Sequence, residues 1–203
     1  MEEVSLRFHH IKKQIFERLD MASLSKCRNV SIFWKKMIDE EKDVWIQKIQ
    51  LKTNRLENQV KTTLRKKTSE ELVQIANQIL QVYNYQEFPL HAAAKYGYLE
   101  TYSLILENYQ NKNPEDDQKN IPMHYAAKYG QLDLCKLILK NLEYGWKKIP
   151  RISEHFIDYD HIMNTNNLQG MTPFDLAAQN GHMDVCRLII ENVDDVCPQL
   201  GYI

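Results

Sequence analysis

The sequence has few of the residue patterns on which cofactor, metal and covalent chemistry depend. It has four cysteines, none of them in a Cys-x-x-Cys pair, and six glycines, none of them in a phosphate-binding loop. Neither a nucleophile elbow nor a His-Glu-x-x-His motif occurs. The sequence therefore predicts a protein that is not an enzyme, with no catalytic residue, no cofactor and no bound metal.

Long apolar runs and a concentrated positive charge are also missing. No stretch supplies the roughly 20 apolar residues of a membrane-spanning helix, and no charged-then-apolar leader opens the sequence. Residues 1–87 carry 16 Lys and Arg against 12 Asp and Glu, whereas residues 88–203 carry 10 against 15. Neither half has the basic face that phosphate-backbone binding needs. We expect a soluble intracellular protein, cytoplasmic or nuclear, that binds neither membranes nor nucleic acids.

What the sequence does contain is one pattern that occurs three times. It spans Phe88–Asn108, Ile121–Asn141 and Thr172–Asn192. Pro89 and Pro122 are 33 residues apart, and Pro173 follows after 51, which is one period of 33 plus an insertion of 18. A fixed period near 33 with a Thr-Pro-Leu-His-x-Ala signature is typical of stacked helix pairs.

The residue types suit a unit of two short helices. Proline lacks a backbone N–H, but at the first helical position that N–H would have no partner within the helix. A glycine in the left-handed conformation ends the first helix. Thr172 can cap its helix, whereas Phe88 and Ile121 cannot. Cys135 and Cys186 occupy the same apolar position in two repeats, which predicts that both are buried and free in a reducing compartment.

These residues resemble the ankyrin repeat over about half of the chain. The resemblance implies an all-α solenoid over residues 88–203. Its repeats are 88–120, 121–169 with an insertion at about 142–161, and 170–203. In this family the histidine of the signature, His91 and His124 here, orients the neighbouring turn through backbone hydrogen bonds.

The resemblance also suggests where a protein target binds. In ankyrin arrays the two residues before each helix-ending glycine project toward the ligand. They are Lys95 and Tyr96, Lys128 and Tyr129, and Gln179 and Asn180. Tyrosine rings beside lysine charges suit an acidic or extended partner, although these positions are equally compatible with ordinary surface. The insertion adds Trp146, and its aromatic residues either bind a partner or pack on the outer helices.

Residues 5–50 follow a different pattern. It consists of Ile15-Phe16-x-x-Leu19-Asp20, Leu24, Cys27, Val30-Ser31, Trp34, Met37-Ile38-Asp39 and a later Trp45. The order and spacing resemble an F-box, with Arg7-Phe8 where the family has Leu-Pro. The resemblance implies a three-helix module that docks on the Skp adaptor of a cullin–RING ubiquitin ligase. The expected adaptor contacts are Phe8, Ile11, Ile15, Leu19 and Leu24, whereas Trp34 is expected to hold the helices together.

Residues 51–87 connect the two modules. Thr68-Ser-Glu-Glu71 has capping-box spacing, and apolar residues from Leu72 to Tyr83 then lie on one helical face. This helix is expected either to cap the first repeat or to be a first repeat that has lost its motif.

The two resemblances together imply a protein–protein interaction adaptor, the substrate receptor of an SCF-type ubiquitin ligase. In that hypothesis the F-box docks on the Skp adaptor and the ankyrin repeats bind a protein target that the sequence does not identify. The alternative is an ankyrin-repeat scaffold outside any ligase, whose N-terminal helices only cap the array.

Overall fold

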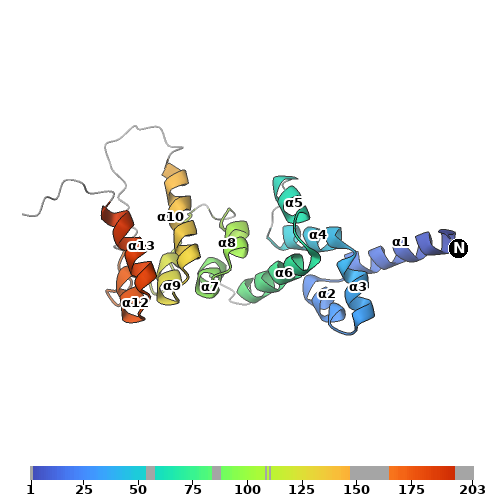
Figure 1. The fold of residues 1–203 in the computed structure, drawn as a ribbon, viewed down its shortest axis with the longest axis horizontal. Coiled ribbons are helices and arrows are strands. Elements are labelled where there is room, and N and C mark those ends of the chain that lie inside the picture. The colour runs from blue at the N-terminus through green and yellow to red at the C-terminus, as the bar shows by residue number, and fades with distance from the viewer. Residues whose placement is uncertain are drawn as a thin grey trace, which may run out of the picture. The chain divides into compact units, whose positions relative to one another are not determined.

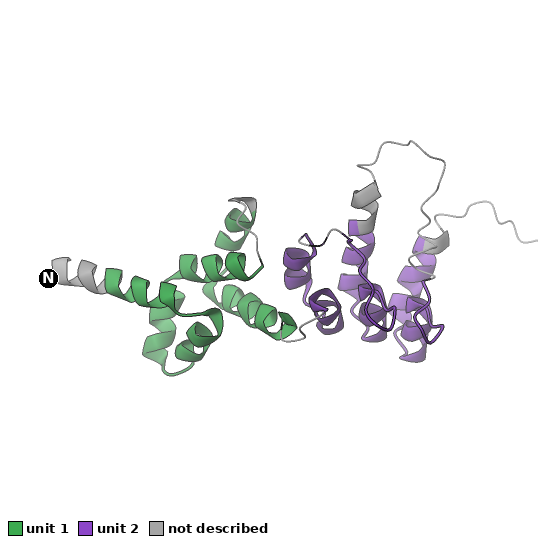
Figure 2. Ribbon diagram, turned by 180° about the vertical axis from the view of Figure 1, so that it is seen from behind, with its two compact units in different colours: residues 1–86 green, residues 87–203 purple. Residues whose placement is uncertain are grey.

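The fold is that of a computed structural model, which describes residues 2–53, 58–83, 88–107, 109, 111–146 and 165–194. Within these ranges all regular structure is α-helical (Figure 1), which confirms the predicted fold class. No helix in the described part is long and apolar enough to cross a membrane. The chain divides into two compact units, unit 1 of residues 1–86 and unit 2 of residues 87–203 (Figure 2).

Six helices make up the described part of unit 1. They are α1 (Glu2–Arg18), α2 (Met21–Arg28), α3 (Ile32–Asp39), α4 (Lys42–Lys52), α5 (Asn58–Arg65) and α6 (Ser69–Tyr83). Four of these, and not the expected three, lie within the predicted N-terminal module, because the segment around Trp45 forms its own helix. The Asp20 and Ser31 side chains accept backbone N–H bonds at the starts of α2 and α3, which defines both helix boundaries.

The core of unit 1 includes α6 as well as the N-terminal helices. Helix α6 packs on α2 and α4, and its Leu72 and Ile79 are fully buried together with Trp45 of α4. A buried arginine reinforces this packing. Arg28 of α2 donates to the Asp39 carboxylate of α3 at 2.6 and 2.9 Å, and to Glu70 of α6 at 3.0 Å. Helix α6, expected either to cap the first repeat or to be a first repeat that has lost its motif, contributes to the core of unit 1.

The described part of unit 2 contains three helix pairs. These pairs lie side by side (Figures 1 and 2). The pairs are α7 (Pro89–Tyr96) with α8 (Leu99–Leu106), α9 (Pro122–Lys128) with α10 (Leu132–Trp146), and α12 (Pro173–Gln179) with α13 (Met183–Asp194). Helix α9 packs between α7 and α12, and α10 contacts both α8 and α13. Cys135 and Cys186 are 0% and 6% exposed in this core, so their predicted burial is confirmed.

The helix ends of unit 2 follow the predicted pattern. A proline opens α7, α9 and α12, and the glycine after each of these helices has a positive φ. Thr172 caps α12 by accepting from the Asp175 N–H at 3.1 Å, and Asp175 accepts from the Thr172 N–H at 2.9 Å. No side chain caps α7 at Phe88.

Candidate protein-binding surfaces

The turns that precede α9 and α12 are built alike. They span residues 116–120 and 167–171, and in each the first N–H donates to the last carbonyl, at 2.9 Å and 3.1 Å. Lys119 lies at φ 57° in the first turn, and Gly170 takes the same position at φ 74° in the second. A backbone hydrogen bond of 2.9 Å joins the two turns, so together they form one edge of the array.

The signature histidines link each helix to the next turn, as expected from the family. His91 Nε2 bonds to the Asn120 carbonyl at 2.9 Å, and His124 Nε2 bonds to the Met171 carbonyl at 3.1 Å. The Ile121 N–H also donates to His124 Nδ1 at 3.2 Å. Because a backbone N–H only donates, Nδ1 of His124 is unprotonated and Nε2 carries the proton. Burial lowers the pKa of both histidines, so both are neutral structural groups.

Lysines and tyrosines of the first two repeats form a continuous surface. We call it the Lys–Tyr face, and its residues are Lys95, Tyr96, Tyr98, Lys128 and Tyr129. The Lys95 ammonium lies 5.5 Å from the ring centroids of both Tyr96 and Tyr129, and the Lys128 ammonium lies 6.0 Å from that of Tyr129. The Tyr96 ring stacks on Tyr98 at 5.4 Å. Cation–π attraction of about 0.5–1 kcal/mol per exposed contact favours this alternating order.

The backbone carbonyl of each lysine of the face accepts a hydrogen bond from a side chain of the next repeat. The Gln131 side chain donates to the Lys95 carbonyl at 3.3 Å, and His182 Nε2 donates to the Lys128 carbonyl at 3.1 Å. Gln131 and His182 are equivalent residues, each following a helix-ending glycine. In the first repeat this position is Tyr98, which the sequence analysis did not assign to the surface. Comparing the residues that follow the three helix-ending glycines would have identified Tyr98.

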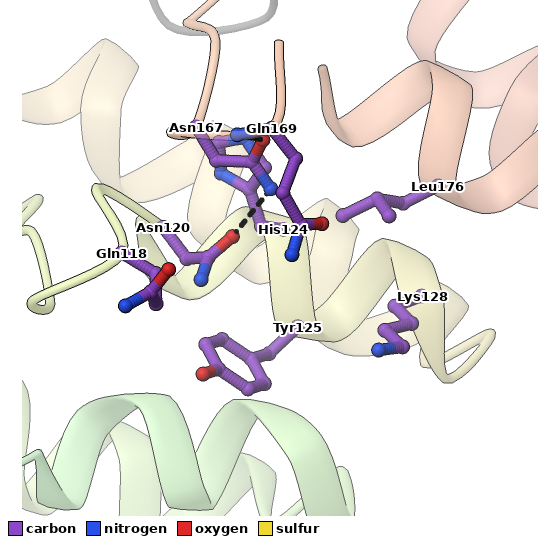
Figure 3. A pocket seen from close by; sticks show the side chains of 8 residues that line it. All are labelled: Gln118, Asn120, His124, Tyr125, Lys128, Asn167, Gln169 and Leu176. Carbon is purple, nitrogen blue, oxygen red and sulfur yellow. Dashed lines mark hydrogen bonds between the residues drawn. The ribbon is translucent and has the colours of Figure 1, made fainter. Parts of the chain in front are cut away.

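A pocket of about 220 Å³ adjoins the Lys–Tyr face at Lys128 (Figure 3). Its lining comes from the two turns, α9 and α12, and consists of Gln118, Asn120, His124, Tyr125, Lys128, Asn167, Gln169 and Leu176. The Asn167 amide donates to the Asn120 side chain at 2.9 Å (Figure 3), and the Tyr125 hydroxyl donates to Asp116 at 2.9 Å. This described lining contains one cation and no carboxylate.

Asp116 stays ionised beside this pocket. Burial opposes its charge, but hydrogen bonds from Asn120, Tyr125 and the Gln118 N–H outweigh burial and hold its pKa below the ordinary value. Burial, with the Asp116 charge, raises the pKa of Tyr125 to about 12. The Tyr125 hydroxyl therefore stays protonated and donates to Asp116. Hydrogen bonds thus already order the polar groups of the pocket wall.

A family model described as ankyrin repeats (3 copies) matches residues 60–149, and a model of the single ankyrin repeat matches residues 169–199. The chain carries an ankyrin-repeat array. Ankyrin repeats are protein–protein interaction modules, so the array is a protein-binding module. The first match begins within α5, ahead of the repeat predicted to start at residue 88. No F-box domain is detected, and no curated protein matches the chain.

The Lys–Tyr face of the ankyrin array ends before its third helix pair. Gln179 and Asn180 are exposed there, but the Asn180 amide donates to the Leu176 carbonyl at 2.8 Å, within its own helix. Trp146 ends α10, and its side chain lies outside the described residues, as does the rest of the insertion from residue 147 to 161.

Cys135 is a fully buried thiol of the ankyrin array. Burial, with the negative charge of Asp184, raises the pKa of Cys135 to about 12, so this thiol is a poor nucleophile. No group of three or more His, Cys, Asp or Glu side chains in the described part is placed to hold a metal ion.

Unit 1, outside the predicted repeats of the ankyrin array, holds the expected adaptor contacts. Ile11 and Ile15 of α1 are 54% and 49% exposed, and Leu19 is half-buried. Leu24 is fully buried, which corrects its assignment as a contact: its side chain packs in the core of unit 1, where no partner reaches it. The side chain of Phe8, in α1, lies outside the described residues.

Unit 1 also exposes apolar residues that the sequence analysis did not single out as contacts. Val30, Ile32 and Phe33 are 72%, 88% and 64% exposed in the turn before α3 and at its start. Trp34, expected to hold the helices together, is 36% exposed and contacts Phe16 of α1 at a ring distance of 6.2 Å. The periodicity of a single short helix does not reveal which of its apolar residues the neighbouring helices leave uncovered.

Proposed function

We propose that the protein is the substrate receptor of an SCF-type cullin–RING ubiquitin ligase. Unit 1 docks on the Skp adaptor, and the ankyrin array holds a protein target. The receptor is not an enzyme; it raises the concentration of the target beside a ubiquitin-carrying enzyme. The free thiols Cys27, Cys135 and Cys186 suit a reducing compartment, the cytoplasm or the nucleus.

One observation carries this proposal: unit 1 exposes large apolar side chains although it has a buried core of its own. Unit 1 buries Trp45, Leu24 and Ile49 completely. It nevertheless leaves Ile11 and Phe33 more than half exposed. Extended exposed apolar surface marks an interaction site, and a helical adaptor would remove it from water.

A pull-down with purified Skp adaptor tests the proposal on the chain of residues 1–203. Ile11→Ala combined with Ile15→Ala should abolish capture, because apolar anchors dominate such interfaces. The thermal stability of the array should hardly change, since both side chains are about half exposed on α1 of unit 1. Lys13→Ala with Gln14→Ala is the matched control on the same helix, because both residues are exposed there.

Wild-type protein that fails to capture the adaptor at micromolar concentration would contradict the ligase role. Equal loss of capture in the isoleucine and control variants would contradict the assigned contacts. Either result would require a different use for the exposed residues of unit 1.

The alternative, a scaffold outside any ligase, is favoured by one observation. The family match begins at residue 60, so α5 and α6 resemble a diverged first repeat. In this case the N-terminal helices only cap the array and need no adaptor. The same pull-down separates the two hypotheses, because the scaffold binds its target through the array but never captures the adaptor.

A further inference from the structure

We propose that the corner between α2 and α3 binds the surface of an anionic lipid membrane. The corner consists of the turn between these helices and the first turn of α3. Its exposed apolar residues, Val30, Ile32 and Phe33, are called the apolar tip. This inference goes beyond the proposed function, because it gives unit 1 a second partner. Ile11 and Ile15 of α1 remain the adaptor contacts, whereas Phe33 is assigned to lipid.

The apolar tip projects from its unit. The turn between α2 and α3 lies at the lower edge of unit 1 (Figure 1), and α3 packs chiefly on α2. Each of the three side chains of the tip is well over half exposed. Apolar anchors of protein interfaces usually fill pockets, whereas a projecting apolar corner can enter the boundary between headgroups and acyl chains. The shape of the tip therefore favours a bilayer over a groove in a protein.

Hydrogen bonds within the corner satisfy backbone groups that lipid cannot. The Asn29 and Val30 N–H groups donate to carbonyls of α2 at 3.0 and 3.1 Å. The Trp34 N–H donates to the Ser31 hydroxyl at 3.2 Å. Unpaired backbone groups are costly in an apolar medium, so these bonds make it easier for the corner to leave water. Trp34 follows the tip with a ring type that is enriched at membrane–water interfaces.

The cations beside the tip select an anionic membrane. Lys26 and Lys36 are exposed, and among the described side chains no carboxylate lies within ion-pair distance of either. No Asp or Glu occurs from residue 21 to residue 38. Lys36 lies one helical turn after Ile32, and both line one hollow on α3. A lysine near an anionic bilayer strengthens binding about fivefold, so the two together favour anionic over neutral lipid.

The carboxylates that line the same hollow are already paired. They are Asp39 and Glu40, at the far end of α3 from the tip. Asp39 accepts from Arg28 at 2.6 Å, and Glu40 lies 3.3 Å from the Lys12 ammonium. Lys36 therefore keeps an uncompensated charge on the side of the helix that carries Ile32.

A surface contact needs no membrane-spanning helix. The expectation that the protein binds no membrane rests on the lack of a membrane-spanning run. A contact through the corner would instead lie in the interface, about 5–10 Å deep, and gain its affinity from apolar burial and from attraction to anionic lipids.

Co-sedimentation with lipid vesicles tests the inference on the chain of residues 1–203. Vesicles of phosphatidylcholine with about 30% phosphatidylserine should bind the protein at least about tenfold more tightly than vesicles of phosphatidylcholine alone. Raising the salt from about 50 to about 300 mM should weaken this binding, because the two lysines are exposed.

Ile32→Ser combined with Phe33→Ser tests the apolar tip. Vesicle binding should fall at least about tenfold, because neither side chain then gains from leaving water. Both residues are exposed, so circular dichroism and adaptor capture should remain as in wild type. Ile11→Ala combined with Ile15→Ala is the reciprocal variant, which should lose adaptor capture and keep vesicle binding.

Two lysine pairs test the charge. Lys26→Ala combined with Lys36→Ala should weaken binding to the anionic vesicles about tenfold or more. Lys136→Ala combined with Lys140→Ala removes the same charge from exposed positions of α10 and should leave binding within about twofold of wild type.

Several results would overturn the inference. Wild-type protein could fail to bind the anionic vesicles, the tip variant could bind them like wild type, or the two lysine pairs could matter equally. Loss of adaptor capture in the tip variant would also overturn it, because the tip would then belong to a protein interface. Adaptor capture by wild type without vesicle binding overturns the membrane contact alone, and vesicle binding without capture overturns the ligase role alone.

Discussion

At the scale of single residues, His91 and His124 join adjacent repeats through Nε2, and burial favours their neutral form. His124 accepts the Ile121 N–H through Nδ1 while Nε2 bonds to the Met171 carbonyl, so an added proton at Nδ1 removes an acceptor. Burial of both rings further disfavours the charged form and lowers their pKa. The unfolded chain, in contrast, protonates both histidines near their ordinary pKa of about 6.5.

We therefore predict that the array loses stability as the pH falls from about 7.5 to about 5.5. The unfolded state binds more protons than the folded state in this window, so the free energy of unfolding rises with pH. The loss is at most about 1.4 kcal/mol per histidine, the limit for a ring that stays neutral in the folded state. Urea denaturation at a series of pH values measures the slope.

His91→Asn and His124→Asn are the controls for this slope. Each lowers stability at all pH values, but each should also flatten the dependence between about pH 5.5 and 7.5 by removing one titrating group. An unchanged slope in both variants would mean that other groups cause the pH dependence. Asp116 and Asp175 do not interfere, since their pKa values lie below the ordinary aspartate value.

At the scale of the elements, the two similar turns differ at one backbone position. Lys119 holds a left-handed conformation at φ 57° in the turn before α9, where the turn before α12 has Gly170. A residue with a Cβ is strained there by about 1–2 kcal/mol, and glycine is not. The hydrogen bonds that Asp116 Oδ1 accepts from the Gln118 and Asn120 N–H groups therefore stabilise the first turn against this local cost.

Lys119→Gly should raise the free energy of unfolding by about 1 kcal/mol. Gly170→Ala should lower it by a similar amount, and by strain alone, because nothing lies within 4 Å of the added Cβ. Chemical denaturation of the two variants measures both changes. A loss of stability in Lys119→Gly would show that the turn does not keep its positive φ in solution.

The sequence predicted the elements of the array better than those of unit 1. The repeat signature is local: a proline, an alanine pair and a glycine set the ends of α7, α9 and α12 without help from distant residues. In unit 1 the pattern located the helices, but packing decided which side chains they bury. Leu24 and Ile11 look alike in the sequence. Leu24 is core because α3, α4 and α6 pack on its helix, whereas Ile11 stays on the surface.

The Lys–Tyr face was predictable only in part for the same reason. Lys95, Tyr96, Lys128 and Tyr129 follow from the repeat. The contact of Lys95 with the Tyr129 ring, and the stacking of Tyr98 on Tyr96, depend on how closely two repeats approach. Side-chain contacts between repeats are a property of the stacked array, which no single repeat contains.

At the scale of the whole molecule, the chain forms two units with separate cores. Each unit buries its own large side chains. A binding function divided between unit 1 and the array requires this independence, since a partner that loosens one unit would otherwise disturb the other. The two tryptophans of unit 1 offer a test.

Trp45→Ala should unfold unit 1 selectively. Trp45 is 0% exposed, and truncating a buried aromatic costs about 3–5 kcal/mol, much of the stability of a small unit. Hydrogen exchange followed by mass spectrometry should show faster exchange in peptides from α1 to α6 and unchanged exchange in those from α7 to α13. Trp34→Ala is the matched control: it removes the same side chain at a position that is already 36% exposed, so its effect on exchange should be smaller. If exchange in the array accelerates together with that in unit 1, the two cores unfold as one, and binding at either unit is coupled to the other through folding.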